Sequence, residues 1–487
     1  MRLNLKDWLP DQSPMESPGS EEIKNCYPVL RGYKPIKSLV EISANALDSR
    51  AKGYYATKAS DGATLTFAGD ADNLYSYSIV TFTEINRTSG GAYTTQDDDQ
   101  YWEFVQFGDR LIATSIENNP QYYDLTTSTH FEDLPGSPPR ARHVAVVRDF
   151  VVFGNTNTLP SEVYWSGDND SEEWTVLVNQ CDRQTLQDGG WIQGIVGGEV
   201  GYVIQERQIV KMTYVGPPVI FQFDVIEAGY GCSSAYSICR IHATAFYRGH
   251  DGFYMLDLVS GNSKAIGSEK VDAWFKANSN GAYSKHIRGA VDPGKKLVWW
   301  SFHSNNSAGI NPDHVIGFNW ELGRWFHAEF DHELITAAYT EAITLDEIDL
   351  YFPDIDQCPI SLDSDYWMGG LPQLRAFSTD HKLALFEGDN LEATVQTPEG
   401  EPVQGRRSMV TVARPLCDTS EATLAIQSRE RLADDVTSTI DGVMETNGDV
   451  SLMSSGRYHR AQVVIPLGAE WTYIQGVDFE AVDDGAI

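Results

Sequence analysis

The sequence predicts an all-β fold and, within that class, a β-propeller of six or seven blades. Residues 142–174 show why, because short apolar or aromatic runs at 144–147, 150–153 and 163–165 alternate with turns rich in Asp, Gly and Asn. Runs of this kind are typical of strands, since they are bounded by turn residues and lack the spacing of an amphipathic helix. One such group of strands cannot bury both of its faces alone, and it therefore needs neighbours of the same kind.

The same order of runs and turns recurs about every 40–50 residues, which is the period of a four-stranded propeller blade. The units lie at residues 51–95, 102–125, 142–174, 191–226, 242–275 and 288–330. None of them carries the Gly-His and Trp-Asp signature of the commonest propeller class. The repeat thus predicts an architecture without predicting a function.

Three regions follow from this pattern: an extended, proline-rich arm at residues 1–45, the propeller at 46–398 and a small C-terminal β domain at 399–487. The arm holds too many prolines for a helix, and prolines favour an extended path. They are Pro10, Pro14, Pro18, Pro28 and Pro35. Because residues 27–30 offer aromatic and apolar side chains for burial, we expect the arm to lie across a partner or the protein's own body. A disordered linker is the alternative.

The chain is strongly acidic, with 36 basic and 69 acidic residues among 487 and a formal net charge of −33. Such a surface repels nucleic acid, so a protein that grips DNA along its backbone is not expected. A channel wall past which DNA slides without sticking would favour the same sign of charge. Acidity that only maintains solubility is the alternative.

The six cysteines are spread along the chain without close pairs, at Cys26, Cys181, Cys232, Cys239, Cys358 and Cys417. Cys232 and Cys239 do not match a common zinc spacing, so free buried thiols in a reducing compartment are predicted, with no metal and no cofactor. The first residues, MRLNLKDWLP, lack the apolar core of a secretory signal, and no apolar run is long enough for a membrane span. We expect synthesis in a cytoplasm.

One acidic stretch in the last third of the chain is harder to assign to a blade. Its carboxylates are Asp346, Glu347, Asp349, Asp354, Asp356, Asp363 and Asp365. Their spacing lacks the Gly and the final Glu of a helix-loop-helix calcium site. We interpret the stretch as an insertion at the propeller edge that lies at an interface or faces a channel.

Two groups of residues carry a resemblance to a known family. Near the start, Asn25-Cys26-Tyr27-Pro28 is followed by Gly32-Tyr33 and Pro35, and near the end Gly456-Arg457-Tyr458 leads into a strand, a Trp strand at Trp471 and an acidic-Gly ending. In these features the chain resembles the tail hub or nozzle proteins of short-tailed bacteriophages, a family that includes the packaged-DNA-stabilisation proteins.

The resemblance implies a structural virion protein and not an enzyme. It implies a homo-hexameric ring beneath a tail adaptor ring, made in the host cytoplasm, with a channel through which genomic DNA is retained and ejected. Residues expected at contacts with neighbouring subunits or tail proteins are Tyr27, Pro28, Tyr33, Pro35, Arg457, Tyr458, Arg460 and Trp471. The acidic stretch from Asp346 to Asp365 would then face the DNA and repel it.

A sialidase-like glycosidase and a propeller that binds glycans or a receptor are the alternatives. Residues 166–174 look like the Ser-x-Asp-x-Gly-x-x-Trp turn of sialidases, but Asp170 replaces the Gly and one extra residue precedes Trp174. A sialidase also needs an arginine cluster and a Tyr near a Glu. The sequence does not show how Arg140, Arg142, Arg148 and Arg183 could form that cluster. Nucleophile-elbow, phosphate-loop and dinucleotide motifs were not found in the sequence.

Overall fold

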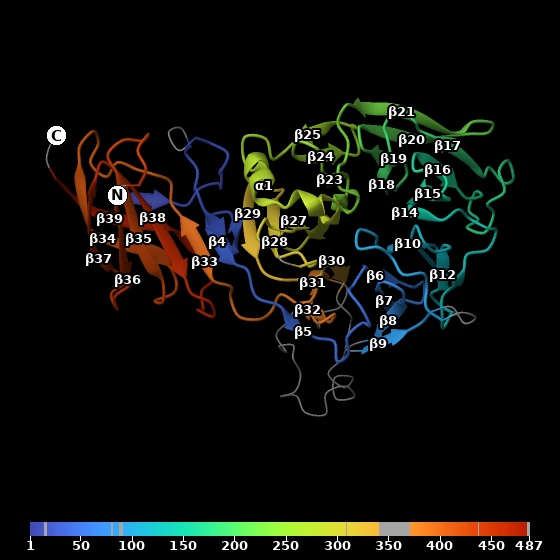
Figure 1. Cartoon of the computed structure of the whole chain (residues 1–487), viewed down its shortest axis with the longest axis horizontal. Coiled ribbons are helices and arrows are strands. Elements are labelled where there is room, and N and C mark those ends of the chain that lie inside the picture. Colours follow the sequence, from blue (N-terminus) through green and yellow to red (C-terminus); the bar gives the residue numbers. More distant parts are fainter. Residues whose placement is uncertain are drawn as a thin grey trace.

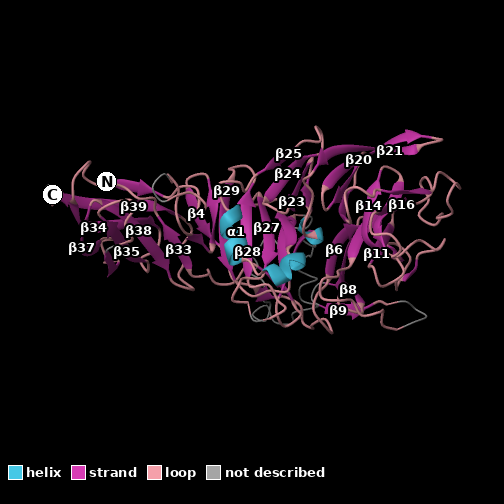
Figure 2. Cartoon of the chain, turned by 45° about the horizontal axis from the view of Figure 1, so that its top comes forward, coloured by secondary structure: helices cyan, strands magenta, loops and turns pink. Residues whose placement is uncertain are grey.

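The computed structural model describes residues 1–13, 17–78, 81–86, 91–307, 309–339, 371–436 and 438–484. These residues form strands almost throughout, in two lobes that lie side by side (Figures 1 and 2). The larger lobe is a β-propeller, and the smaller lobe, which contains both ends of the chain, is a β-sandwich. The predicted all-β propeller is confirmed.

The first five blades are meanders of four antiparallel strands, a topology that needs only short turns between neighbours. Their strands are β6 (Gly53–Lys58), β7 (Thr64–Gly69), β8 (Leu74–Ser78) and β9 (Thr81–Glu84); β10 (Glu103–Phe107), β11 (Arg110–Thr114), β12 (Gln121–Asp124) and β13 (Glu132–Asp133); β14 (Ala141–Val147), β15 (Phe150–Thr156), β16 (Glu162–Trp165) and β17 (Asp182–Thr185); β18 (Ile192–Val196), β19 (Gly201–Gln205), β20 (Gln208–Gly216) and β21 (Ile220–Ala228); and β22 (Cys239–Ile241), β23 (Thr244–Arg248), β24 (Phe253–Asp257) and β25 (Ser263–Ala265).

The sixth blade follows the same plan, but the seventh takes its outermost strand from the other end of the chain. Their strands are β26 (Arg288–Asp292), β27 (Leu297–Phe302), β28 (His314–Asn319) and β29 (Arg324–Glu329), and then β30 (Leu334–Tyr339), β31 (Pro372–Phe377), β32 (Leu383–Leu385) and β5 (Val40–Glu41). In the seventh blade, Val40 pairs with Leu385 and Glu41 with Ala384. Residues near the N-terminus therefore close the ring.

The innermost strands of the blades contact one another around the ring. β6, β10, β14 and β18 follow in order, and β26 and β30 return to β6. Between β18 and β26 the contact passes through the short 3-10 helix η1 (Ala235–Ser237) and β22. The described residues thus form a closed ring of seven blades, within the expected range of six or seven.

The second lobe consists of two sheets that pack face to face around one apolar core. One sheet contains β3 (Cys26–Val29), β4 (Gly32–Pro35), β39 (Ile474–Asp483), β34 (Ser408–Cys417) and β37 (Val450–Gly456), with β1 (Arg2–Asn4) paired to β39. The other contains β2 (Ile23–Lys24), β33 (Ala393–Gln396), β38 (Tyr458–Ile465), β35 (Thr423–Arg429) and β36 (Ser438–Val443), and it continues directly from blade six.

The N-terminal segment, which we expected to lie across a partner or the protein's own body, pairs with both lobes. β2 pairs in parallel with β29 of blade six and antiparallel with β33 of the sandwich, and so joins the sheets of the two lobes. Pro28 and Pro35 are accommodated in β3 and β4, and β3 lies at a sheet edge, where a missing N–H donor is tolerated. The C-terminal β domain is therefore completed by strands from the first 45 residues.

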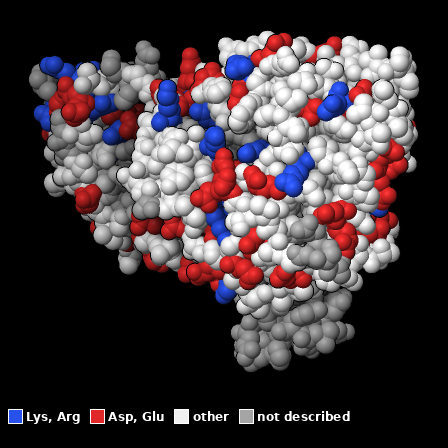
Figure 3. Space-filling model, turned by 45° about the vertical axis from the view of Figure 1, so that its right-hand side comes forward, with Lys and Arg blue, Asp and Glu red and all other residues white. Residues whose placement is uncertain are grey.

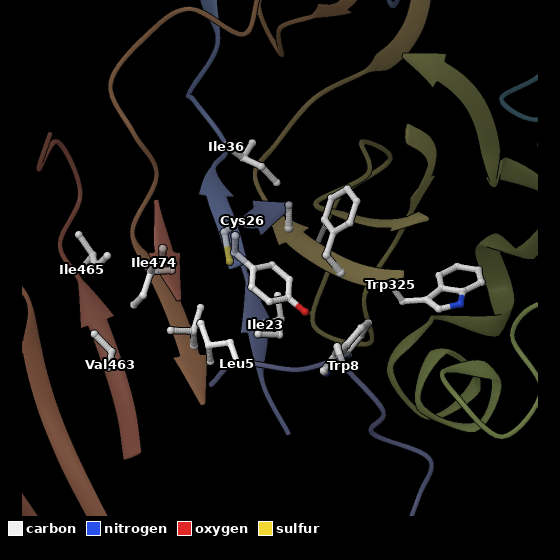
Figure 4. Packing of buried hydrophobic residues seen from close by; sticks show 14 of the residues in the cluster. Leu5, Trp8, Ile23, Cys26, Ile36, Trp325, Val463, Ile465 and Ile474 are labelled. Carbon is white, nitrogen blue, oxygen red and sulfur yellow. The ribbon is translucent and has the colours of Figure 1, made fainter. Parts of the chain in front are cut away.

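One apolar cluster extends across the junction of the lobes (Figure 4). Trp8, Ile23 and Cys26 of the N-terminal segment are fully buried, and the same cluster contains Trp325 of blade six and Ile465 of the sandwich. Full burial of a large apolar side chain contributes roughly 1.5–3 kcal/mol. Because the two lobes share this core, we expect them to behave as one body.

The helices are short, and the longest of them lies near the same junction. Besides η1 they are α1 (Asp272–Asn278) and η2 (Gly281–His286). The carboxylate of Asp11 accepts hydrogen bonds of 2.7 Å from the backbone N–H groups of Ala273 and Trp274, and so satisfies the free amides at the start of α1. Trp8 packs edge-on against Trp274, with ring centroids 4.7 Å apart. In the part of the chain that the structure describes, no helix is long and apolar enough to cross a bilayer.

Candidate functional site

The residues expected at subunit contacts in the N-terminal segment lie at the junction of the lobes. Tyr33 is fully buried, and its hydroxyl donates a hydrogen bond of 2.6 Å to the Lys6 carbonyl. Pro28 is buried as well, whereas Tyr27 and Pro35 are half-buried. Their side chains therefore contact the chain itself, and only Tyr27 and Pro35 keep surface for a partner.

Trp471 lies next to this group, whereas the C-terminal residues Arg457 and Tyr458 lie further along the sandwich. Trp471 is 4% exposed and, with Tyr27 and Pro35, lines an open cavity of about 850 Å³. Arg457 contacts Glu401 at 3.3 Å and lies over the ring of Tyr458. The structure thus brings Trp471 together with the N-terminal residues and leaves Arg457 and Tyr458 apart from them.

Arg460 connects the two groups. Its Nη1 forms an ion pair with the Glu21 carboxylate, and its Nε donates a hydrogen bond of 2.6 Å to Gln427 Oε1. Arg460 lies on β38 and Glu21 lies two residues before β2, so the pair links the sandwich to the segment that joins the lobes. The expected channel-facing acidic residues, from Asp346 to Asp365, lie outside the described residues.

The sialidase-like turn at residues 166–174 is part of the third blade and connects β16 to β17. The Trp174 indole donates a hydrogen bond of 2.9 Å to the Ser171 carbonyl, and its ring stacks on Phe153 and Tyr164. Ser166 Oγ accepts a hydrogen bond of 3.0 Å from the Val151 N–H. The turn therefore has a structural role within the blade.

The four arginines considered for a sialidase site do not converge. Arg140 bonds to the Glu117 carbonyl, and Arg142 bonds to the Asp99 carbonyl. Arg148 stacks over the Tyr214 ring and Arg183 pairs with Glu162. Among the described residues, no group of three or more His, Cys, Asp or Glu side chains is placed to hold a metal ion.

A different group of polar residues gathers where the innermost strands begin, around the axis of the propeller. Tyr236 of η1 packs against Tyr101 at 4.7 Å and against His143 at 5.8 Å between ring centroids. The Arg288 guanidinium lies 4.7 Å from the centroid of the Tyr101 ring and 5.9 Å from that of Tyr236. Blades two, three and six and the helix η1 thus contribute to one cluster, which we call the axial site and which also includes Glu103.

Glu103 is the acid of the axial site, and both of its oxygens are occupied. Oε1 is 2.7 Å from His143 Nδ1, and Oε2 accepts a hydrogen bond of 3.1 Å from the Val144 N–H. Glu103, Tyr236 and Arg288 line a cavity of about 160 Å³. Nη1 of Arg288 is buried here without a hydrogen-bond partner. Burial raises the pKa of the Tyr236 hydroxyl, which therefore stays protonated and is a potential donor.

Arg50, just before β6, is a second unusual cation, although it does not line this cavity. It is 6% exposed, and its three guanidinium nitrogens make no hydrogen bond. Burial lowers the pKa of Arg288, and the charge of Arg50 lowers it further. Sequence reasoning missed these residues because they come from distant parts of the chain and no motif marks them. The one available signal was their position, since Arg50, Tyr101 and Arg288 lie at or just before the start of an innermost strand.

No protein-family model matches the chain, and no curated protein matches its sequence. Among solved structures, the chain is similar to the extracellular domain of BT4673 from B. thetaiotaomicron, with 12% identity over 80% of this chain and 45% of that chain and a TM-score of 0.42. It thus spans less than half of that structure's length.

Two further solved structures show a similarity of the same degree. BamB from Moraxella catarrhalis has 10% identity over 74% of this chain and 92% of that chain, with a TM-score of 0.37. The Neurospora crassa Pan2 WD40 domain has 7% identity over 72% and 94%, with a TM-score of 0.40. These sequence identities and TM-scores are too low to support an inference about function.

Proposed function

We propose that this chain is a structural virion protein, a subunit of the nozzle or hub ring of a short phage tail. The observation that carries the proposal is the position of the residues on which the family resemblance rests. Asn25, Tyr33 and Trp471 come from opposite ends of the chain, yet all of them lie where the sandwich meets the propeller. These residues therefore hold the two lobes in a fixed relative position, which a subunit of a ring assembly needs.

In this proposal the chain assembles as a homo-hexamer beneath the tail adaptor ring, and DNA passes through the channel without tight binding. The net charge of −33 supports the last point, because an acidic wall repels the phosphate backbone. On the face shown in Figure 3, acidic side chains are spread widely among uncharged residues. The proposed role needs no catalytic group and no cofactor.

Immunogold electron microscopy of particles from the source, with antibody raised against the purified chain, tests the proposal. We expect gold at the distal end of the tail, and image reconstruction should show a ring of sixfold symmetry there. Gold absent from every particle, with the protein free in the lysate, would contradict it. Particles assembled without the protein should leak DNA, and the supplied wild-type chain should restore retention.

A sialidase-like glycosidase is the second candidate, because the axial site combines Arg288 with a Tyr and a Glu. Two observations weigh against it. Tyr236 is only 7% exposed, and the cavity of about 160 Å³ is small for a sugar. Hydrolysis of a fluorogenic sialoside by the purified chain, and its loss in Tyr236→Phe, would favour this candidate over the nozzle.

A further inference from the structure

We propose that two neighbouring turns of the propeller form an apolar tip that docks on the surface of a zwitterionic lipid bilayer. The first turn, residues 175–181, leads from β16 to β17 in blade three, and the second, residues 215–219, is the end of the β20–β21 hairpin in blade four. Both turns expose aliphatic or proline side chains to solvent. These residues, which we call the apolar tip, are Leu177, Val178, Val215, Pro217, Pro218 and Val219.

A hydrogen bond holds the two turns beside each other. The Tyr214 hydroxyl, one residue before Val215, donates a bond of 2.9 Å to Gln180 Oε1. Gln180 belongs to the same turn as Leu177, whose N–H donates a bond of 2.8 Å to the Cys181 carbonyl. The β20–β21 hairpin ends at the side of the propeller farthest from the sandwich (Figures 1 and 2). The exposed apolar side chains thus gather at one end of the molecule.

The first turn is strained and yet held in place. The backbone φ is 71° at Leu177, 45° at Asn179 and 66° at Gln180, and this left-handed conformation is unfavourable for a leucine. The Trp165 indole donates a bond of 2.9 Å to the Gln180 carbonyl, and the Asn179 amide donates one of 3.1 Å to the Asp168 carbonyl. These bonds keep Leu177 in a conformation in which it is 85% exposed. A strained backbone that presents an apolar side chain to water indicates a function for that side chain.

The apolar tip carries no charge, as insertion into a lipid surface requires. Residues 175–181 and 215–219 contain no Asp, Glu, Lys or Arg, although these residue types make up 22% of the chain. The nearest charged residues along the chain are Glu173, Asp182, Lys211 and Asp224. Because a charged side chain in hydrocarbon is costly, these residues limit the depth of insertion, and only the tip itself would enter the lipid.

The backbone of the two turns also suits an apolar surrounding, in which polar groups need partners within the protein. The Val178 N–H donates a bond of 3.0 Å to the Thr175 carbonyl, and the Cys181 N–H donates one of 2.8 Å to the Val178 carbonyl. In the second turn, two prolines have no N–H to satisfy. Desolvation of these turns therefore costs little in lost hydrogen bonds.

Two observations favour a neutral lipid surface over a protein partner or an anionic membrane. The side chains that dominate protein interfaces are mostly Trp, Tyr and Arg, whereas the apolar tip consists of Leu, Val and Pro alone. The chain has a formal net charge of −33, with Glu173 and Asp182 close behind the tip, and anionic headgroups would repel it. A zwitterionic surface takes up the apolar side chains without that repulsion.

Flotation of the full chain with sonicated phosphatidylcholine vesicles at neutral pH tests the proposal. We expect the wild type to float with the vesicles, and less of it to float when phosphatidylglycerol replaces part of the phosphatidylcholine. Leu177→Asn should lower the partition coefficient by about tenfold or more, because the burial of a leucine is lost. Asn adopts a positive φ readily, so this variant should melt at the same temperature as the wild type or higher. Lost binding at full stability excludes misfolding as its cause.

Leu30→Asn is the matched control. Leu30 is 77% exposed in the turn between β3 and β4 of the other lobe, so its replacement should leave the partition coefficient unchanged. Val219→Asn tests the second turn and should weaken binding as well. No flotation of the wild type, or equal partition of the wild type, Leu177→Asn and Val219→Asn, would overturn the proposal.

Sedimentation velocity without lipid distinguishes the other occupants of the tip. Self-association of the wild type that is lost in Leu177→Asn, without flotation, would overturn the proposal and assign the tip to a second copy of the chain. A wild type that neither floats nor self-associates would overturn it in favour of an apolar pocket on another protein. The apolar tip does not depend on the proposed nozzle role, so failure of either proposal leaves the other standing.

Discussion

Asn25 and Glu392 are joined by a hydrogen bond of 2.8 Å, in which the side-chain amide of Asn25 donates to the Glu392 backbone carbonyl. The Asn25 side-chain oxygen accepts a second bond of 2.8 Å, from the Glu329 N–H at the end of blade six. One buried side chain therefore links the propeller to the segment that enters the sandwich. Asn25 also has a φ of 58°, a left-handed conformation that Asn adopts more readily than most residues.

The first prediction concerns this link. Asn25→Ala should reduce the free energy of unfolding by about 3 kcal/mol, because two backbone groups lose their partner and Ala is strained at a positive φ. Urea denaturation followed by tryptophan fluorescence measures the loss. Asn25→Gly is the matched control, since it loses the same bonds without the strain and should cost less than the Ala variant. Equal stability of Asn25→Ala and the wild type would show that the link is unimportant.

The second prediction concerns closure of the propeller ring. The Ile42 N–H donates a hydrogen bond of 2.8 Å to the Leu383 carbonyl, beside the pairing of β5 with β32. Ile42→Pro removes that donor and a buried side chain, so the free energy of unfolding should fall by about 3 kcal/mol or more. Ile42→Val keeps the N–H and should cost about 1 kcal/mol. Thermal melts compare the stabilities of the Pro and Val variants. Similar losses of stability in both would mean that closure of the ring by β5 adds little to the stability of the protein.

The blades were predictable from the sequence because each carries its own apolar runs and turns within about 40–50 residues. The pairing of β2 at the junction of the lobes and that of β5 in the seventh blade were not predictable, because each strand has only two residues and so carries no periodicity. Their pairing depends on residues about three hundred positions away, such as His327 and Leu385. The prolines predicted an extended path, and Pro28 and Pro35 do lie in strands, but nothing local showed that this segment would pair with both lobes.

The axial site was unpredictable for a related reason. Tyr101, Tyr236 and Arg288 are separated by long intervals and follow no known motif, and only closure of the ring places them together. The sialidase-like turn at residues 166–174, which does resemble a motif, turned out to be part of a blade.

The third prediction concerns the thiols. Cys26 and Cys232 are fully buried, and burial raises the pKa of Cys232 to about 11 and that of Cys26 well above its usual value. Because the thiolate is the reactive species, neither residue should be alkylated by iodoacetamide in the folded protein within the time needed to label the denatured chain fully. Peptide mapping by mass spectrometry checks this. Fast native labelling of Cys26 would show that the junction opens in solution.

The last prediction is a pH dependence that originates at His332. This residue is fully buried; its Nδ1 is 3.0 Å from the Phe330 carbonyl, and its Nε2 is hydrogen-bonded to Ser301 Oγ. Burial lowers its pKa to about 4 from an ordinary value of 6.5. As the pH falls from 6.5 towards 4, the unfolded chain therefore takes up a proton that the folded chain does not, and stability decreases.

The loss attributable to His332 should approach about 3 kcal/mol at the acid end of this range. Urea denaturation at several pH values should show a steep decline for the wild type and a shallower one for His332→Gln, even though the variant is less stable at neutral pH. The difference between the two slopes isolates His332 from the carboxylates that titrate in the same range. His286, whose pKa is also lowered to about 4, contributes with the same sign, so some decline should persist in the variant. If the stability of the wild type and that of His332→Gln fall equally with decreasing pH, the prediction that burial keeps His332 neutral in the folded chain would be wrong.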